Sequence, residues 1–154
     1  MEAPLIRAVI YMPHYDHQPL AKAMIDRAGS INARYSHDQR ELEAAIREHD
    51  CHVLMIFAPR RMADLGQILT QVAPYLLRWQ LAISVVGAAP TLDQAHRLRR
   101  AAVTDYSILP LGGKTLGRRL RRAVALKQEM EHWEKSWDNS WDDKPGQPPL
   151  SLAA

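Results

Sequence analysis

Short apolar runs alternate with amphipathic stretches along most of the chain, and this alternation predicts five strands and five helices. The run at 52–57 is apolar at almost every position, which is typical of a parallel strand covered on both faces. Each connecting segment is long enough for a helix, so parallel strands with right-handed crossovers are expected. The pattern predicts a doubly wound α/β domain whose ligands would bind beyond the strands' carboxyl ends. The predicted strands are 6–12, 30–36, 52–57, 81–86 and 106–109.

Capping and turn residues predict where the helices begin and end. The third helix, residues 62–80, contains Pro74, which should kink or end it. The fourth is expected to turn Leu92, Ala95 and Leu98 toward the sheet. The predicted caps are Pro19 and Gly29 for the first helix, Asp38 in a capping box with Glu41 for the second, and Thr91 for the fourth.

The last predicted strand ends at a proline. Residues 106–109 run directly into Pro110, which has no N–H for a strand ladder and therefore belongs at the strand's end. Gly112 and Gly113 then interrupt the chain before a long basic helix. This order of strand, proline, glycine pair and helix is the most distinctive local pattern in the chain.

Composition narrows the class of protein. The 154 residues suit one domain plus a tail, and 47% hydrophobic with 24% charged residues suits a globular core. The single cysteine, Cys51, fits a reducing compartment. No apolar run approaches a bilayer span and residues 1–4 lack a basic leader, so we expect a cytoplasmic protein without membrane association. The net charge of +3 matters only if it gathers on one face.

Residues 102–111, Ala-Val-Thr-Asp-Tyr-Ser-Ile-Leu-Pro-Leu, resemble the last strand of response-regulator receiver domains (CheY-like). The family pattern there is Gly-Ala-x-Asp-Tyr/Phe-x-x-Lys-Pro-Phe. The resemblance covers residues 5 to 127 in order and spacing. It implies a flavodoxin-like, five-stranded parallel sheet of strand order 2-1-3-4-5, here with an extended C-terminal helix.

The resemblance also implies where phosphorylation chemistry would be, and this chain lacks it at each position. The third-strand pattern, Pro-Asp-φ-φ-φ-φ-Asp-φ-φ-φ-Pro with φ apolar, matches residues 49–59. Phosphoryl transfer needs a carboxylate nucleophile, oxygen ligands for magnesium and a cation. We therefore expect a degenerate receiver, or pseudo-receiver, that is not an enzyme and holds no metal or cofactor. The degenerate positions are Met55 for the phosphoacceptor, Met12 and Pro13 for the magnesium-binding acids, Gly87 for the Ser/Thr and Leu109 for the lysine.

The loop after the first strand carries His14, Asp16 and His17, at the end where such folds bind ligands. A metal site would need a further ligand, and the neighbouring loops supply none, so ordinary loop residues are favoured. The same loop has no glycine to bring backbone amides close to a phosphate. A nucleotide or flavin site is therefore not favoured.

Two other groups of reactive or charged residues have simpler explanations. Cys51 and His52 are adjacent on a predicted buried strand and should point to opposite faces, so a nucleophile pair is not expected. His52 is interpreted as a core histidine with its hydrogen bonds satisfied. Arg60 and Arg61 would hold an anion at a pocket mouth, but a solvated loop is favoured.

Basic residues crowd the last two helices. In the receiver family, these helices and the strand between them, here with Tyr106, form the usual dimer or partner face. A basic version suits an acidic protein partner or, with less support, nucleic-acid phosphates, because no aromatic residue interleaves the arginines. A solvated helix face is the simpler alternative. The residues are Arg97, Arg99, Arg100, Lys114, Arg118, Arg119, Arg121, Arg122 and Lys127.

The last helix is predicted to continue beyond the domain. Apolar residues recur at a and d heptad positions, and three tryptophans four residues apart follow in an acidic stretch. Self-association through this helix is expected, with docking on the chain's own domain as the alternative, and the opposite charges would make an assembly self-complementary. The predicted parts are a domain at 1–127, a helical extension at 128–143 and a disordered tail at 144–154. The seam comprises Leu116, Ala123, Leu126, Met130, Trp133 and Trp137, and the tryptophan stripe adds Trp141.

Together these features predict a phosphorylation-independent protein-interaction and signalling module that affects transcription through a partner. The alternative is a small-ligand or nucleic-acid sensor on the same fold that regulates gene expression. The terminal residues 152–154 also resemble the small apolar termini that AAA+ protease adaptors bind, although a frayed end is favoured.

Overall fold

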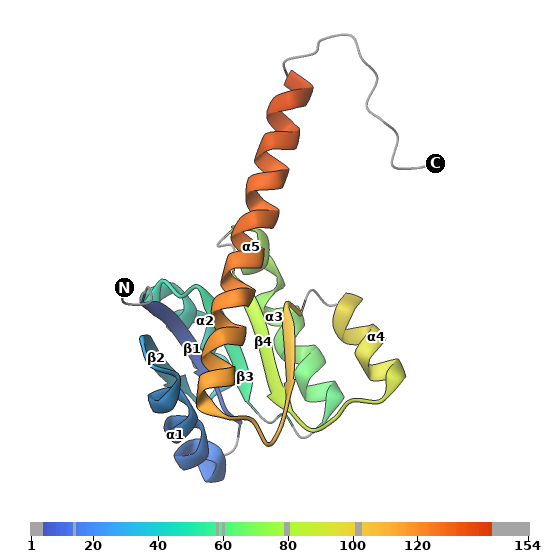
Figure 1. The fold of residues 1–154 in the computed structure, drawn as a ribbon. Helices are drawn as coiled ribbons and strands as arrows, with labels where there is room; N and C mark the ends of the chain where they lie inside the picture. Colours follow the sequence, from blue (N-terminus) through green and yellow to red (C-terminus); the bar gives the residue numbers. More distant parts are fainter. Residues whose placement is uncertain are drawn as a thin grey trace.

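A computed structural model describes the chain over residues 5–13, 15–57, 59, 61–78, 81–100 and 103–142, with side chains to residue 129 except at 15, 62 and 75–78. Its strands form one parallel sheet of order β2-β1-β3-β4-β5 (Figure 1). The predicted doubly wound fold is confirmed. The strands are β1 Ile6–Tyr11, β2 Ile31–Ser36, β3 Val53–Phe57, β4 Ala82–Gly87 and β5 Asp105–Ile108. The helices are α1 Gln18–Ala28, α2 Gln39–His49, α3 Met62–Arg78, α4 Leu92–Arg100 and α5 Gly113–Asp142, and a 3₁₀ turn, η1, covers Tyr15–His17.

The helices form two layers around the sheet, with α1 and α5 on one face and α2, α3 and α4 on the other (Figure 1). Alternation along β3 divides its side chains between two cores. Leu54 and Ile56 pack with α2 and α3, whereas Met55 and Phe57 pack with α1 and α5. All five residues of β3 are buried, so the prediction of a strand covered on both faces is confirmed.

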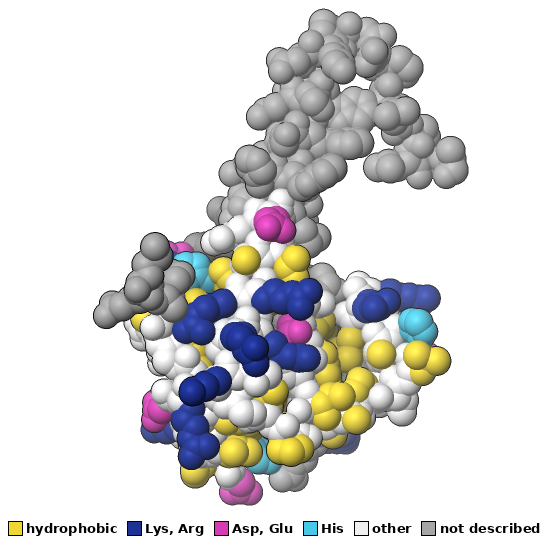
Figure 2. Space-filling model, in the orientation of Figure 1, with side chains coloured by type: hydrophobic (Ala, Val, Ile, Leu, Met, Phe, Trp, Pro, Cys, Tyr) yellow, Lys and Arg dark blue, Asp and Glu magenta, His cyan; other side chains and the backbone are white. Residues whose placement is uncertain are grey.

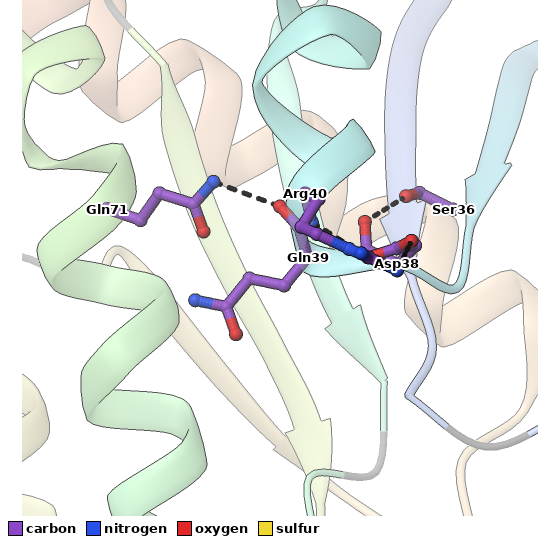
Figure 3. Close-up of polar contacts among 5 residues, drawn as sticks. All are labelled: Ser36, Asp38, Gln39, Arg40 and Gln71. Atoms are coloured by element: carbon purple, nitrogen blue, oxygen red, sulfur yellow. Dashed lines mark hydrogen bonds and ion pairs between the residues drawn. The ribbon is translucent and has the colours of Figure 1, made fainter.

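Asp38 caps the N-terminus of α2, as predicted. The Asp38 carboxylate accepts a hydrogen bond from the Arg40 backbone N–H at 2.9 Å, while the Glu41 N–H donates to the Asp38 carbonyl at 3.1 Å. The Arg40 guanidinium also contacts this carboxylate, and these bonds lower the pKa of Asp38. From α3, the Gln71 amide donates to the Gln39 carbonyl at 3.0 Å and so ties the two helices together (Figure 3).

The sequence predicted that Pro74 would either kink α3 or end it. The structure shows that α3 does not end there. It continues to Arg78. A proline inside a helix removes one hydrogen bond and crowds the carbonyl four residues earlier. Apolar residues in the preceding turns offset that cost because they are buried against the sheet; they are Leu65, Ile68, Leu69 and Val72.

The fourth helix begins as predicted but faces the sheet with fewer residues. Thr91 Oγ1 accepts from the Gln94 N–H at 3.2 Å and Gln94 Oε1 accepts from the Thr91 N–H at 2.9 Å, a complete capping box. Leu98 is buried, but Leu92 is 77% exposed, so the prediction that Leu92 faces inward is wrong. The reason is position: α4 lies beside the edge strand β5, and its first turn extends past the sheet (Figure 1).

Two glycines bring α5 close to α1. A Cβ at Gly113 would overlap the Arg27 side chain and lie 2.8 Å from the Met24 carbonyl oxygen. A Cβ at Gly117 would lie 3.0 Å from the Ala28 carbonyl oxygen. The absence of a side chain at these positions therefore lets the two helices pack backbone against backbone.

Among the described residues, no helix has the length and apolar character needed to cross a membrane.

Candidate functional site

The carboxyl end of β1 is occupied by apolar side chains. Met12 is fully buried, and its backbone N–H donates to the Ser36 carbonyl at 2.8 Å. The His37 ring donates from Nδ1 to the Met12 carbonyl at 3.0 Å. Pro13 follows, partly buried. The two positions at which the resemblance implied magnesium-binding acids thus provide hydrocarbon and no carboxylate.

The end of β3 lies two residues beyond the position that the sequence alignment assigned to the phosphoacceptor. Met55 is fully buried in mid-strand, opposite Ile10 on β1 and Ser84 on β4. Phe57 ends the strand, also fully buried, with its ring centroid 6.0 Å from that of His17 in an edge-to-face contact. Met55, assigned from the sequence, and Phe57, at the strand end, are both uncharged. Neither assignment therefore provides a carboxylate that could accept a phosphoryl group.

At the end of β4, the missing side chain of Gly87 gives room to Tyr106. The Tyr106 hydroxyl donates to the Ala88 carbonyl at 2.5 Å, and a Cβ at Gly87 would lie 3.2 Å from that hydroxyl. Burial raises the pKa of Tyr106. Leu109 closes the same edge: its N–H donates to the Gly87 carbonyl at 2.9 Å and its side chain packs on the core beneath α1 and α5.

The loop beside this edge does not form a ligand cluster. Asp16 is exposed in η1, and His17 packs on Phe57 at the start of α1. His14 and Arg60 lie outside the described residues, and Arg61 pairs with Asp64 at 3.5 Å. In the part of the chain that the structure describes, no three histidine, cysteine or acidic residues come together in a way that suits a metal ion.

Cys51 and His52 have separate environments. Burial raises the pKa of the Cys51 thiol to about 11, so the thiolate is scarce near neutral pH. His52 instead contacts Arg7, which donates its backbone N–H to Nδ1 at 3.1 Å and places Nη2 3.1 Å from Nε2. Burial and then the Arg7 guanidinium lower the pKa of His52. His52 therefore has hydrogen-bond partners, as predicted, but it is partly buried and lies just before β3, so the prediction of a core histidine is wrong.

Arg119, predicted to lie on a partner face, holds α5 to β5. Its Nη1 donates to the Tyr106 carbonyl and to Ser107 Oγ, both at 3.0 Å, and lies 3.7 Å from the Asp105 carboxylate. The Ser107 hydroxyl in turn donates to Asp105 at 3.1 Å. Because Ser107 is fully buried, this network anchors the last strand to the last helix.

Most of the other predicted basic residues gather on the outside of α4 and α5, but Arg121 and Lys127 are partly buried, and Arg121 donates to the Gly29 carbonyl at 2.8 Å. Figure 2 shows Lys and Arg side chains over α5 and α1, with more at the end of α4. Two exposed apolar side chains escaped the sequence analysis, Leu92 and Ile108, the latter at 50%; Leu126, a predicted seam residue, is 39% exposed. Ile108 is exposed because β5 is an edge strand, which the sequence pattern alone does not reveal. The exposed basic residues are Arg97, Arg99, Arg100, Lys114, Arg118 and Arg122.

Two concave regions lie near this surface. One, of about 240 Å³, lies between α4 and β5. The other, of about 310 Å³, lies where α5 leaves the domain. Their linings are Pro90, Ala95, Leu98, Arg99, Val103, Thr104, Asp105 and Tyr106 for the first, and Leu5, Ile6, His52, Arg121, Val124, Ala125 and Gln128 for the second.

The extended helix is present, but it does not offer the whole predicted seam to a partner. α5 is one helix to Asp142 and projects from the domain (Figure 1). Leu116 and Ala123 are buried against the chain's own sheet, whereas Leu126 is exposed. The side chains of Met130, Trp133, Trp137 and Trp141 lie outside the described residues, as does the predicted tail at 144–154. A seam between copies therefore begins no earlier than Leu126.

Comparison with known proteins places the fold. A CheY-like response regulator receiver domain protein from Methanospirillum hungatei JF-1 superposes with a TM-score of 0.64 at 14% identity, covering 82% of this chain and 98% of that one. A receiver domain protein from Clostridium thermocellum gives 0.66 at 13% identity, covering 82% and 99%. A pilus assembly-related protein from Burkholderia pseudomallei K96243 gives 0.64 at 20% identity, covering 79% and 90%. No family model and no curated protein matches the sequence.

The class of protein that emerges is defined by its architecture. The chain has the CheY-like receiver fold, with strand order β2-β1-β3-β4-β5 and an extended C-terminal helix. The identities are all low, so the similarity establishes the fold and leaves activity to be argued from the residues.

Proposed function

We propose that this chain is a pseudo-receiver, a signalling module that acts by binding another protein and does not depend on phosphorylation. The observation that carries this proposal is the apolar carboxyl edge of the sheet. Met12, Phe57 and Leu109 are the side chains that close it, and the first two are fully buried. Transfer of a phosphoryl group to an aspartate needs a carboxylate, magnesium ligands and a cation at that edge.

The proposed working surface is the α4–β5–α5 face together with the projecting half of α5. Both helices carry exposed arginines, and Leu92 of α4 and Ile108 of β5 are exposed apolar side chains. Apolar residues within a charged rim are typical of protein interaction sites, and the positive charge favours an acidic partner. An effect on transcription would then pass through that partner.

Treatment with acetyl phosphate and Mg²⁺, followed by intact-mass measurement, tests the phosphorylation part. We expect no added phosphoryl group under conditions in which a CheY-like receiver is modified. A phosphoryl group mapped to Asp16 or Asp50 would contradict the proposal.

Capture from native lysate tests the binding part. We expect wild-type protein to retain a partner that the double variant Trp133→Ala/Trp137→Ala loses, because large rings are frequent anchors of interfaces. The matched control is a double substitution at exposed positions of α2, Arg47→Ala/Glu48→Ala, which should retain the partner. Equal recovery with all three proteins would remove the helical extension from the working surface.

The α4–β5 pocket supports a second candidate, a small-ligand or nucleic-acid sensor. The pocket measures about 240 Å³ and includes the Arg99 and Asp105 side chains beside apolar ones. The basic face would contact phosphates, and such contacts give a steep fall of log affinity with log salt. A salt series with duplex and single-stranded oligonucleotides separates this candidate from an acidic protein partner.

A further inference from the structure

One row of side-chain positions on α5 changes charge from end to end. Residues four apart are neighbours on a helix surface and form a continuous ridge. Because α5 is a single helix from Gly113 to Asp142, one such ridge runs along its whole length. In order, the ridge contains three basic residues, two apolar residues and three acidic residues: Lys114, Arg118, Arg122, Leu126, Met130, Glu134, Asp138 and Asp142.

The basic half of this ridge faces away from the domain. Lys114, Arg118 and Arg122 are exposed, while the helix face that carries Leu116 and Leu120 is buried on the sheet. No ion pair formed among the described residues uses these three basic side chains. Arg118 makes only a long contact, 3.5 Å, with the neighbouring Thr115 hydroxyl. The basic half of the ridge therefore presents positive charge that no acidic side chain in the described part of its own domain pairs with.

The acidic half of the same helix is unable to neutralise this charge within one chain. Arg122 and Glu134 are twelve positions apart in α5, which corresponds to about 18 Å along the axis at 1.5 Å per residue. A continuous helix holds them at that separation. A parallel pair of helices would place acid beside acid, because each ridge member would meet its own copy. Only a reversed second helix brings the two halves together.

We propose that a second copy of this chain packs antiparallel on α5, ridge to ridge. Leu126 then meets the partner's Met130 and Arg122 meets the partner's Glu134. Arg118 and the partner's Asp138 lie farther from the crossing point, where their opposite charges attract without direct contact. Each pair occurs twice, because reversing the helix about the height of Gln128 exchanges its two members, as an isologous twofold interface requires. This inference rests on the proposed function and names the partner of its projecting helix.

Packing of equivalent four-residue ridges sets the expected geometry. Such ridges interdigitate at a crossing of about 50° between helix axes. That crossing carries the two domains to opposite ends of the helix pair and away from each other. Trp133 and Trp137 each precede an acidic ridge member by one position in the sequence.

Reciprocal charge reversal tests the register. The wild-type full chain should have twice the 17.5 kDa mass of one chain by light scattering. Arg118→Glu/Arg122→Glu and Glu134→Arg/Asp138→Arg should each be monomeric at the same concentration. An equimolar mixture of the two variants should form a heterodimer, since both sets of contacts regain opposite charges. The control Arg47→Glu/Arg61→Glu changes the charge equally on the α2–α3 side and should remain dimeric.

The outcomes separate this inference from the proposed function. A monomeric wild type, or two reversal variants that stay dimeric, would overturn the antiparallel pairing. Failure of the mixture to associate would also overturn it, provided circular dichroism shows both variants folded; an unfolded variant is replaced by the milder Arg122→Glu and Glu134→Arg pair, read the same way. The acetyl phosphate and capture experiments do not depend on these results.

Discussion

The carboxyl edge of the sheet and the outer surface of α5 differ in every property that matters for function. At the edge, Met12 and Phe57 are fully buried, and hydrogen bonds there link backbone to backbone or hold the His37 and Tyr106 rings on backbone carbonyls. On α5, the exposed side chains of Lys114, Arg118 and Arg122 form no ion pair among the described residues. Doubly wound folds usually bind ligands at the first of these places. In this chain the first is packed like a core, and the second carries the features of a binding surface.

The difference indicates that the same fold can be packed tightly at one surface and carry unpaired charge at another. Apolar residues at the edge add burial to the core and remove the need for a bound cation. The outer surface of α5 is under no such packing demand, so charge accumulates there at little cost to stability.

The largest expected effect comes from restoring a carboxylate to the buried edge. Met55→Asp should lower the free energy of unfolding by about 4 kcal/mol or more, because an isolated acid would be buried among apolar residues. Met55→Leu keeps the volume and should cost less than about 1.5 kcal/mol. Urea unfolding measures both. An aspartate variant as stable as wild type would show that this position is open to water.

The packing of α5 on α1 can be broken by one methyl group. Gly113→Ala should destabilise the fold by about 1–3 kcal/mol, since its Cβ would overlap the Arg27 side chain. Gly66→Ala is the matched control, in α3 with open space around it, and should stabilise by up to about 1 kcal/mol. Thermal unfolding of both proteins is the measurement. Equal effects of the two substitutions would contradict the close helix contact.

A smaller effect is expected where the two regions meet, at the network that joins β5 to α5. Arg119→Met removes two hydrogen bonds to β5 and should cost about 1–2 kcal/mol. Arg47→Met, at an exposed position of α2, should change stability by less than about 0.5 kcal/mol. Chemical denaturation compares them. If Arg119→Met behaved like Arg47→Met, Arg119 would belong with the free surface arginines.

The smallest effect concerns pH and lies at the amino end of the sheet. Because the pKa of His52 is lowered by burial and by Arg7, against the opposing Asp50 charge, the unfolded chain binds a proton at this residue more readily than the folded chain. Stability should therefore fall as the pH drops below about 6.5, the ordinary histidine value. The stability difference between wild type and His52→Gln should shrink between pH 7.5 and 5.5. A difference that grew toward acid pH would reverse the sign of this coupling.

The sequence by itself determined the architecture and the chemistry that is missing. Alternating apolar runs determine the strands, and caps such as Asp38 and Thr91 determine where helices begin. Whether Met55 or Phe57 is taken as the phosphoacceptor position, β3 has no carboxylate there. These features are local, since periodicity and capping depend on neighbours within a few residues. They can therefore be predicted without knowledge of any tertiary contact.

Only the tertiary structure decided which residues of the predicted surface are free. Arg119 forms hydrogen bonds that join α5 to β5. Leu116 and Ala123 are buried in the core, and Leu92 is exposed. Each outcome depends on which element lies opposite in space and on where the sheet ends. A sequence pattern records that a residue is apolar or charged, but burial depends on partners that are distant in the chain.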